Sequence, residues 1–286
     1  MPSLRHPNPF LVAALCLALA PAASPATPTA PPLPRIVSLV PSLTETLFAI
    51  GAGPQVVGVS QFTDYPPQAA ALPVVSSFAS IDAERVLRLR PGVVVGIEAQ
   101  GARLADVRRL GIVPTLVPDD SFEDIFVDID VLGRVSGHPS EARALAGRLR
   151  ARTAALVARV PQGERPTCFV VIGTAPIFTV GDRSYIAHLI SLAGGRNAAR
   201  DLPSAYGRYS EEALLRAQPD AIVADRASGV ANFLGRPPWN ALRAVRNHRV
   251  YILDDAALLE RPGPRYNDGL AWLIEKLHPK AADAAR

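Results

Sequence analysis

One helix–turn–strand pattern occurs twice in this chain and constrains its fold more than any other feature. The segment IDAERVLRLRPGVVV (81–95) returns 128 positions later as YSEEALLRAQPDAIV (209–223), and the two align without a gap. Glu84 aligns with Glu212, each in the first turn of a predicted helix. Each copy predicts a capped helix, a proline turn and a strand buried on both faces. The repetition therefore predicts two similar halves.

A second pair of segments supports this duplication. Residues 42–53 (SLTETLFAIGAG) and 184–195 (SYIAHLISLAGG) both predict a helix that ends in a glycine-containing cap. Chance agreement between amphipathic helices is the alternative explanation. Around these segments, short runs rich in Val and Ile alternate with helical patterns, which favours an α/β fold. The runs are 35–40, 56–60, 73–75, 93–97, 114–118, 168–173, 221–225 and 250–254.

A long helix is predicted between the two groups of strands. Residues 139–160 are rich in the strong helix formers Ala, Leu and Arg, with Pro139 at the start and Pro161 at the stop. Thr153 fills the one gap in the apolar stripe, which consists of Ala142, Leu145, Leu149, Leu156 and Val160. We therefore predict an α/β protein of two Rossmann-like lobes joined by a single long backbone helix.

The N-terminus predicts export. Arg5 precedes the apolar run LVAALCLALA and a stretch of small residues, and the run is too short for a bilayer, which needs about 20 residues. Lipid attachment at Cys16 is the alternative to a cleaved signal, although Leu15 is bulky where a small residue is needed. The expected organisation is a signal peptide (1–25), a disordered linker (26–34), an N-terminal lobe (35–120), a connecting helical segment (121–161) and a C-terminal lobe (162–286).

Several function classes find no support in the sequence. The formal charge of +4 is scattered over single arginines, so no nucleic-acid partner is expected. No dinucleotide fingerprint, P-loop or nucleophile elbow is present, and the five histidines are dispersed. We expect no catalytic residues, no metal site and no cofactor, with a secreted α/β enzyme as the alternative. Cys168 lies in the apolar run CFVVIG, which predicts a buried, inert thiol.

Three motifs carry a family resemblance. SLVPSLTE (38–45), GVSQFTDYPP (58–67) and ERPGPR (260–265), together with the repeated E-x-x-L-x-x-x-P pattern, resemble the cobalamin-binding subunit of ABC importers. This subunit belongs to a class of helical-backbone receptors for corrinoids, haem and ferric siderophores. The resemblance runs from Arg35 to about His278. It implies a periplasmic monomer that holds its ligand between two lobes.

The resemblance also implies a transport partner. Glutamates at the tips of the two lobes dock onto an ABC permease dimer in this class, and Glu84 and Glu212 match those positions. The alternative is local, because an acid in the first turn complements the helix dipole.

The resemblance further suggests where the ligand is bound. Phe62, Phe78, Ile97, Phe178 and Tyr206 match positions in loops at strand ends that are often aromatic in cobalamin binders, and Asp255, Arg261 and Arg265 are the polar candidates. Close cobalamin binders carry tryptophan at several of these positions, and ordinary packing is the alternative for each aromatic residue. Haem remains an alternative ligand through Tyr65 or Tyr206, and a siderophore through Arg208, Arg261 and Arg265.

Overall fold

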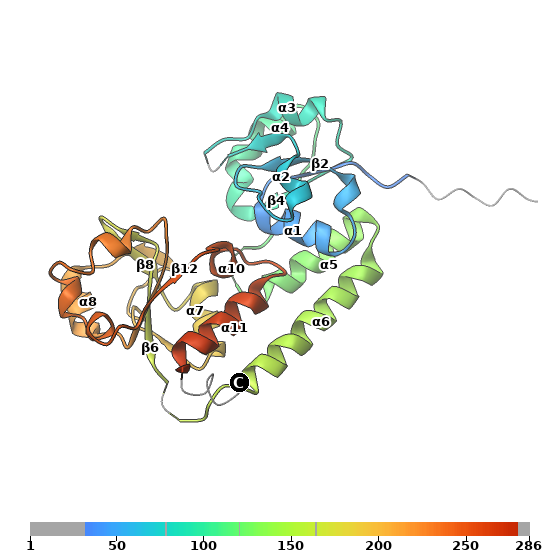
Figure 1. Ribbon diagram of the computed structural model, residues 1–286. Helices are drawn as coiled ribbons and strands as arrows, with labels where there is room; N and C mark the ends of the chain where they lie inside the picture. Colours follow the sequence, from blue (N-terminus) through green and yellow to red (C-terminus); the bar gives the residue numbers. More distant parts are fainter. Residues whose placement is uncertain (1–31, 78, 120, 164, 280–286) are drawn as a thin grey trace, which may run out of the picture. The chain divides into compact units, whose positions relative to one another are not determined.

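A computed structural model describes residues 32–77, 79–119, 121–163 and 165–279 (Figure 1). The predicted signal peptide with Cys16, most of the predicted linker, and Phe78 lie outside the described residues. No helix in the described part of the chain is long and apolar enough to cross a membrane.

The N-terminal lobe is built on a five-stranded parallel sheet with the strand order β3-β2-β1-β4-β5. Ile36 and Val37 of the central strand are both fully buried, and they pack into separate apolar clusters. Consecutive apolar residues in this strand therefore serve both faces of the sheet, as its sequence predicts. The strands are β1 (Ile36–Ser38), β2 (Val56–Ser60), β3 (Val74–Ser76), β4 (Val93–Ile97) and β5 (Thr115–Val117). The helices are α1 (Pro41–Ala49), α2 (Pro67–Ala70), α3 (Ala83–Arg88) and α4 (Ala105–Arg109), with 3₁₀ turns η1 (Gly53–Gln55) and η2 (Glu98–Leu104).

The C-terminal lobe has a four-stranded parallel sheet of order β12-β11-β6-β9 and a separate three-stranded antiparallel sheet of order β10-β8-β7. The parallel strands are β6 (Thr167–Val171), β9 (Arg196–Asn197), β11 (Ala221–Asp225) and β12 (Val250–Leu253). The antiparallel strands are β7 (Gly173–Thr174), β8 (Ile177–Val180) and β10 (Tyr206–Arg208). The helices are α7 (Tyr185–Leu192), α8 (Glu211–Ala217), α9 (Arg243–Arg246), α10 (Ala257–Glu260) and α11 (Tyr266–Leu277), with 3₁₀ turns η3 (Val230–Asn232) and η4 (Trp239–Ala241).

The antiparallel sheet corrects one expectation from the sequence. The sequence predicts loops at Phe178 and Tyr206, but these residues lie on β8 and β10. Neither strand has the consecutive Val and Ile residues that mark the buried parallel strands in the sequence.

The repeated segments occupy equivalent places in the two parallel sheets. The strand after α3 is β4, which pairs with β1, and the strand after α8 is β11, which pairs with β6. The helix caps also correspond, because the Asp82 carboxylate accepts from the Arg85 amide at 2.8 Å and the Ser210 hydroxyl accepts from the Ala213 amide at 3.1 Å. The two lobes therefore share one arrangement of helices and strands, as the duplication predicts.

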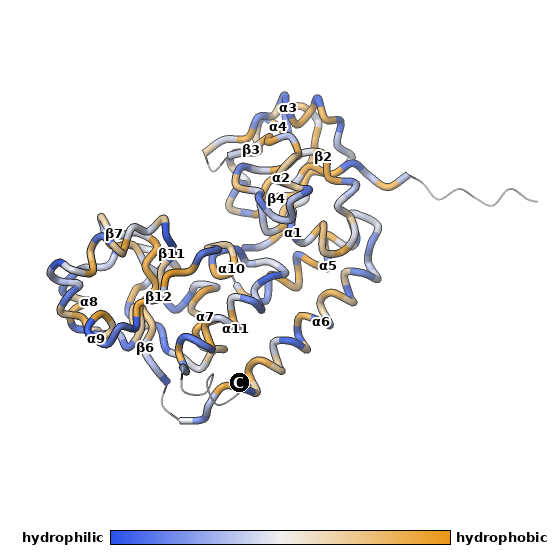
Figure 2. The backbone as a smooth tube through the Cα atoms, viewed as in Figure 1, coloured by the Kyte–Doolittle hydropathy of each residue, from blue (hydrophilic) through white to orange (hydrophobic). Residues whose placement is uncertain are grey.

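The connection between the lobes consists of α5 (Asp124–Ser136) and α6 (Pro139–Val157). The long helix α6 begins at Pro139 and ends three residues before Val160, the last position of the predicted stripe. Apolar and polar residues alternate along α6 (Figure 2), and it packs against α5 and α11. Thr153, at the gap in the stripe, lies 2.6 Å from the Tyr266 hydroxyl of α11 and donates to Leu149 O at 2.9 Å.

Candidate ligand-binding site

Two exposed aromatic side chains lie in the loop that follows β2. Phe62 is 68% exposed and has a φ of 64°, a left-handed conformation that is rare for a bulky residue. The loop is held by the Gln61 amide, which donates to Ser76 O at 2.7 Å. Tyr65 is exposed in the same loop. A strained backbone that holds a phenyl ring in solvent indicates a surface that contacts another molecule.

A second exposed aromatic pair lies on the antiparallel sheet of the C-terminal lobe. Tyr206 is paired with Val180, and Arg208 is paired with Phe178. Cross-strand partners share one face of a sheet, so Phe178, Tyr206 and Arg208 lie on the same face and are all exposed. The other side chains of β8 are buried, namely Ile177, Thr179 and Val180, and Val180 lies on the same face as Phe178.

Ile97, the remaining apolar candidate among the described residues, ends β4. It is half-buried and packs partly against the main apolar core. Its contact with a ligand stays a prediction.

A buried ion-pair cluster ties α1 to the segment between α10 and α11. The side chain of Glu45 is only 2% exposed. Arg265 holds it through two hydrogen bonds, from Nε to Oε2 at 2.8 Å and from Nη2 to Oε1 at 3.0 Å. Arg261 Nη1 donates to the same Oε1 at 3.0 Å. A buried carboxylate is tolerated when such charge-assisted bonds replace its lost hydration.

The two arginines also bind exposed carboxylates. Arg261 donates to Asp64 at 2.6 and 3.2 Å and to the carbonyl of Phe62 at 2.8 Å. Arg265 donates to Asp255 at 2.7 Å, and its guanidinium carbon lies 4.1 Å from the centre of the Tyr65 ring. The hydrogen bond from Arg261 is the main reason why the pKa of Asp64 falls below its ordinary value.

This arrangement gives two of the C-terminal polar candidates a structural role. Arg261 and Arg265 help to fix the loop that carries Phe62 and Tyr65. Contact of Arg261, Arg265 and Asp255 with a ligand stays a prediction. The siderophore alternative relied on Arg208, Arg261 and Arg265, and two of these three cations are already neutralised.

Residues 260–265 contact the aromatic loop that follows β2. Arg261 donates to the Phe62 carbonyl at 2.8 Å. Partial burial, with a smaller effect from the charge of Glu260, raises the pKa of Tyr206. Partial burial also raises the pKa of the Glu260 carboxyl to about 7, with a further contribution from Asp225 and an opposing one from Arg261. That the pairs Phe62–Tyr65 and Phe178–Tyr206 contact one ligand stays a prediction.

Tyr185 supplies an unpaired polar group near this region. Its hydroxyl is buried and has no hydrogen-bond partner among the described residues. Burial raises the pKa of Tyr185, and the charges of Tyr206, Tyr266 and Glu45 add to the increase. An unpaired buried hydroxyl costs free energy, so it is a candidate for bonding to a ligand or water.

Sequence reasoning missed both Glu45 and Tyr185. A signal for Glu45 was available, because it ends the motif SLVPSLTE and its two partners are the arginines of ERPGPR. Complementary charges in two family motifs would have suggested the pairing. No sequence signal distinguishes Tyr185 from an ordinary core tyrosine.

The two predicted docking glutamates have matching local geometry. Glu84 and Glu212 each occupy the second helical position after the N-cap, in α3 and α8, and both are exposed. Glu84 also lies 3.9 Å from Arg88, a weak surface pair. Both residues are accessible to a partner and complement the helix dipole at the same time.

The described residues offer neither a cluster of metal ligands nor an accessible thiol. They contain no group of three or more His, Cys, Asp or Glu side chains that could hold a metal ion. Cys168 is fully buried, and burial raises the pKa of its thiol to about 12, with a small opposing effect from Arg249. The predicted buried, inert thiol is confirmed.

Two α/β lobes, a connecting helix and paired aromatic surfaces define the class of two-lobe solute-binding proteins. The chain belongs to the periplasmic binding protein family, whose model matches residues 36–257. The vitamin B12-binding protein of Vibrio cholerae is 31% identical over 242 residues, which cover 84% of this chain and 87% of that protein.

Solved structures show the same fold. The crystal structure of the periplasmic vitamin B12-binding protein BtuF of Vibrio cholerae matches with a TM-score of 0.77 and 30% identity, covering 87% of this chain and 98% of that chain. The periplasmic heme-binding protein RhuT from Roseiflexus sp. RS-1, in apo form, also matches with a TM-score of 0.77 and 30% identity, covering 86% of this chain and 98% of that chain.

Proposed function

We propose that this chain is the substrate-binding protein of an ABC importer and that it captures cobalamin or a related corrinoid between its lobes. Family membership and the relatives named for vitamin B12 binding support the transport role. One observation carries the choice of ligand: each lobe presents a pair of exposed aromatic residues. A broad apolar ring edged with amides suits flat aromatic walls with a few polar groups.

The proposed mechanism is capture and delivery without covalent chemistry. The unbroken helix α6 and the buried Glu45 cluster both resist large movements of one lobe against the other. Small closure on the ligand is therefore expected, in contrast to hinge-bending binding proteins. Release occurs when a dimeric permease engages Glu84 and Glu212 and separates the lobes.

The proposed location is the periplasm. The predicted signal peptide and the family of periplasmic binding proteins support it. The proposal includes a monomer with no cofactor of its own and no catalytic activity, in keeping with a family of transport proteins.

Haem is the second candidate ligand. A haem-binding neighbour matches this chain with the same TM-score and identity as the B12-binding one. Tyr65 and Tyr206 are exposed phenols, and one tyrosine is sufficient for an axial bond to haem iron. The raised pKa of Tyr206 disfavours its phenolate, the form that binds iron.

Substitution of the aromatic walls tests the proposed site. Phe62→Ala and Phe178→Ala should each weaken cyanocobalamin binding about tenfold, because each removes roughly 1–3 kcal/mol of apolar contact. Equilibrium titration measures the affinity. Val113→Ala is the matched control, since Val113 is an exposed apolar residue outside the site. Unchanged affinity in both variants would place the ligand elsewhere.

A further inference from the structure

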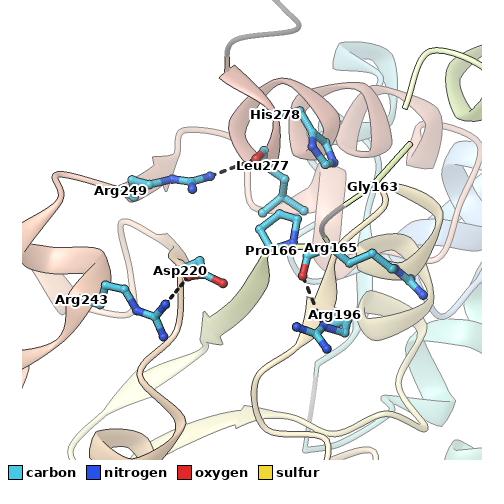
Figure 3. Close-up of a pocket in the computed structure, with 9 residues that line it drawn as sticks. All are labelled: Gly163, Arg165, Pro166, Arg196, Asp220, Arg243, Arg249, Leu277 and His278. Atoms are coloured by element: carbon cyan, nitrogen blue, oxygen red, sulfur yellow. Dashed lines mark hydrogen bonds and ion pairs between the residues drawn. The ribbon is translucent and has the colours of Figure 1, made fainter. Parts of the chain in front are cut away.

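A strongly basic hollow of about 710 Å³ lies in the C-terminal lobe, apart from the aromatic site (Figure 3). Four arginines from separate parts of the lobe line it, with one carboxylate among the described lining residues. The lining consists of Gly163, Arg165, Pro166, Arg196, Asp220, Arg243, Arg249, Leu277 and His278.

Three of the arginines at the hollow are held in place by bonds that use only some of their N–H donors. Arg243 Nη1 lies 3.0 Å from Asp220 Oδ1, Arg249 Nη2 donates to Leu277 O at 3.0 Å, and Arg196 Nε donates to Arg165 O at 3.2 Å. Arg165 points away from the other three and binds the end of α7 (Figure 3). The remaining guanidinium donors of the three are thus preorganised without being used up.

Positive charge is in excess at this hollow. Asp220 is already occupied, since its Oδ2 accepts from both the amide and the hydroxyl of Thr167 at 2.8 Å. Burial opposes its ionisation, but these bonds and the charges of Arg243 and Arg249 outweigh that effect and hold the pKa of Asp220 below its ordinary value. Among the described lining residues, one carboxylate therefore faces the guanidinium groups of Arg196, Arg243 and Arg249.

Arg249 is partly buried at the hollow. Its Nε has no hydrogen-bond partner among the described residues, but this atom is inaccessible to solvent. An anion in the hollow would therefore meet the outer guanidinium nitrogens of Arg249. The charge excess favours an anionic ligand.

We propose that this hollow binds a phosphate group, with Arg196, Arg243 and Arg249 as its donors. Arginine suits phosphate because its planar guanidinium donates two parallel hydrogen bonds. The volume falls within the range of small-molecule sites. Two adjacent hollows share Arg196 and add Arg200, so a ligand with more than one phosphate has further cations within the same surface.

Calorimetry with the mature protein at low ionic strength tests the proposal, using inorganic phosphate and pyrophosphate as probes. Both should bind, and pyrophosphate should bind more tightly. Arg196→Glu should weaken binding at least tenfold, because it replaces a charge-assisted donor with a repelling carboxylate. Arg196 is exposed, so the variant should fold, which circular dichroism verifies. Arg148→Glu is the matched control, an exposed charge reversal on α6 outside the lining.

Vesicles distinguish a free phosphate from a lipid headgroup. Co-sedimentation with phosphatidylglycerol vesicles, lost in Arg196→Glu and absent with phosphatidylcholine, would assign the phosphate to a lipid and support the proposal. Equal losses in Arg196→Glu and Arg148→Glu would overturn it, since the effect would then be one of overall charge. Binding of neither phosphate probe nor anionic vesicle would also overturn it. The aromatic site shares no residue with the hollow, so corrinoid binding is unaffected by either result.

Discussion

Glu45 illustrates, at the scale of single residues, what the sequence does and does not disclose. A buried carboxylate requires partners, and its partners Arg261 and Arg265 lie more than 200 positions away along the chain. The residues next to Glu45 do not indicate this pairing, and the only signal in the sequence is the complementary charge of two distant family motifs. By contrast, the caps of α3 and α8 and the burial of Cys168 depend on neighbouring residues, and the sequence predicts them correctly.

Phe62 is a second residue whose conformation cannot be read from the sequence. The family motif marks it as a ligand candidate, but its positive φ and its exposure follow from the loop conformation, which Arg261 helps to fix. Its strain could not be inferred from QFTDYPP alone.

Asp128 gives a pH-dependent prediction at this scale. Its carboxyl is buried on α5, and burial, with added repulsion from Asp124 and Asp119, raises its pKa to about 8. A raised folded-state pKa means that stability is full below the unfolded value near 4 and falls as the pH rises toward 8. Asp128→Asn should remove this fall and raise the free energy of unfolding at pH 7 by roughly 3 kcal/mol.

Urea denaturation between pH 4 and pH 8 measures the effect. The variant and the parent should have similar stability near pH 4 and diverge as the pH increases. Asp182→Asn, at an exposed position, is the control and should leave the profile unchanged. Parallel profiles for Asp128→Asn and the parent would contradict the raised pKa.

The helix pair α5–α6 sets the geometry at the scale of secondary-structure elements. An ideal Cβ on Gly133 of α5 would lie 2.4 Å from the Cβ of Ala142 in α6, so only glycine permits this close approach. A Cβ added to Gly147 of α6, in contrast, would meet no atom within 4 Å, and this glycine lies in an ordinary helical conformation. The two glycines thus occur in the same helix pair for different reasons.

Alanine substitution should change the free energy of unfolding in opposite directions at the two glycines. Gly133→Ala should lower the free energy of unfolding by about 1–3 kcal/mol, because the added methyl group forces the helices apart. Gly147→Ala should raise it by up to about 1 kcal/mol through helix propensity. Thermal and urea denaturation measure both effects, and a stabilising Gly133→Ala would contradict the packing described for α5 and α6.

Most elements were predictable, and the exceptions have a common cause. Buried parallel strands contain consecutive Val and Ile, and α6 has a clear apolar stripe, so both stand out in the sequence. The strands β7, β8 and β10 have two to four residues each and pair with each other in an antiparallel sheet. Their pairing depends on tertiary contacts, which is why the sequence predicts loops at Phe178 and Tyr206.

At the scale of the whole molecule, the two lobes share one arrangement of helices and strands, so they present a pair of equivalent surfaces. Glu84 and Glu212 occupy matching positions on α3 and α8. The proposed docking pairs these positions with the two equivalent surfaces of a two-fold symmetric permease. Charges at the rim of an interface mainly set association rate and register. Docking, rather than ligand binding, should therefore depend on these residues.

The double variant Glu84→Ala/Glu212→Ala should retain its ligand affinity and lose most of its ability to support uptake by its cognate importer. Each single variant should have an intermediate effect, since one contact remains. Glu211→Ala, one position from Glu212 and also exposed, is the matched control. Uptake at the parental rate by the double variant would refute the docking role.

The central claim, that the lobes bind a corrinoid between aromatic walls, is tested most directly by titrating the purified protein with cyanocobalamin, cobinamide, haem and a ferric siderophore. Intrinsic fluorescence follows binding in each case. We predict saturable, one-to-one quenching by a corrinoid at lower concentration than by either haem or the siderophore. Saturation by haem or the siderophore without any response to the corrinoids would contradict the account.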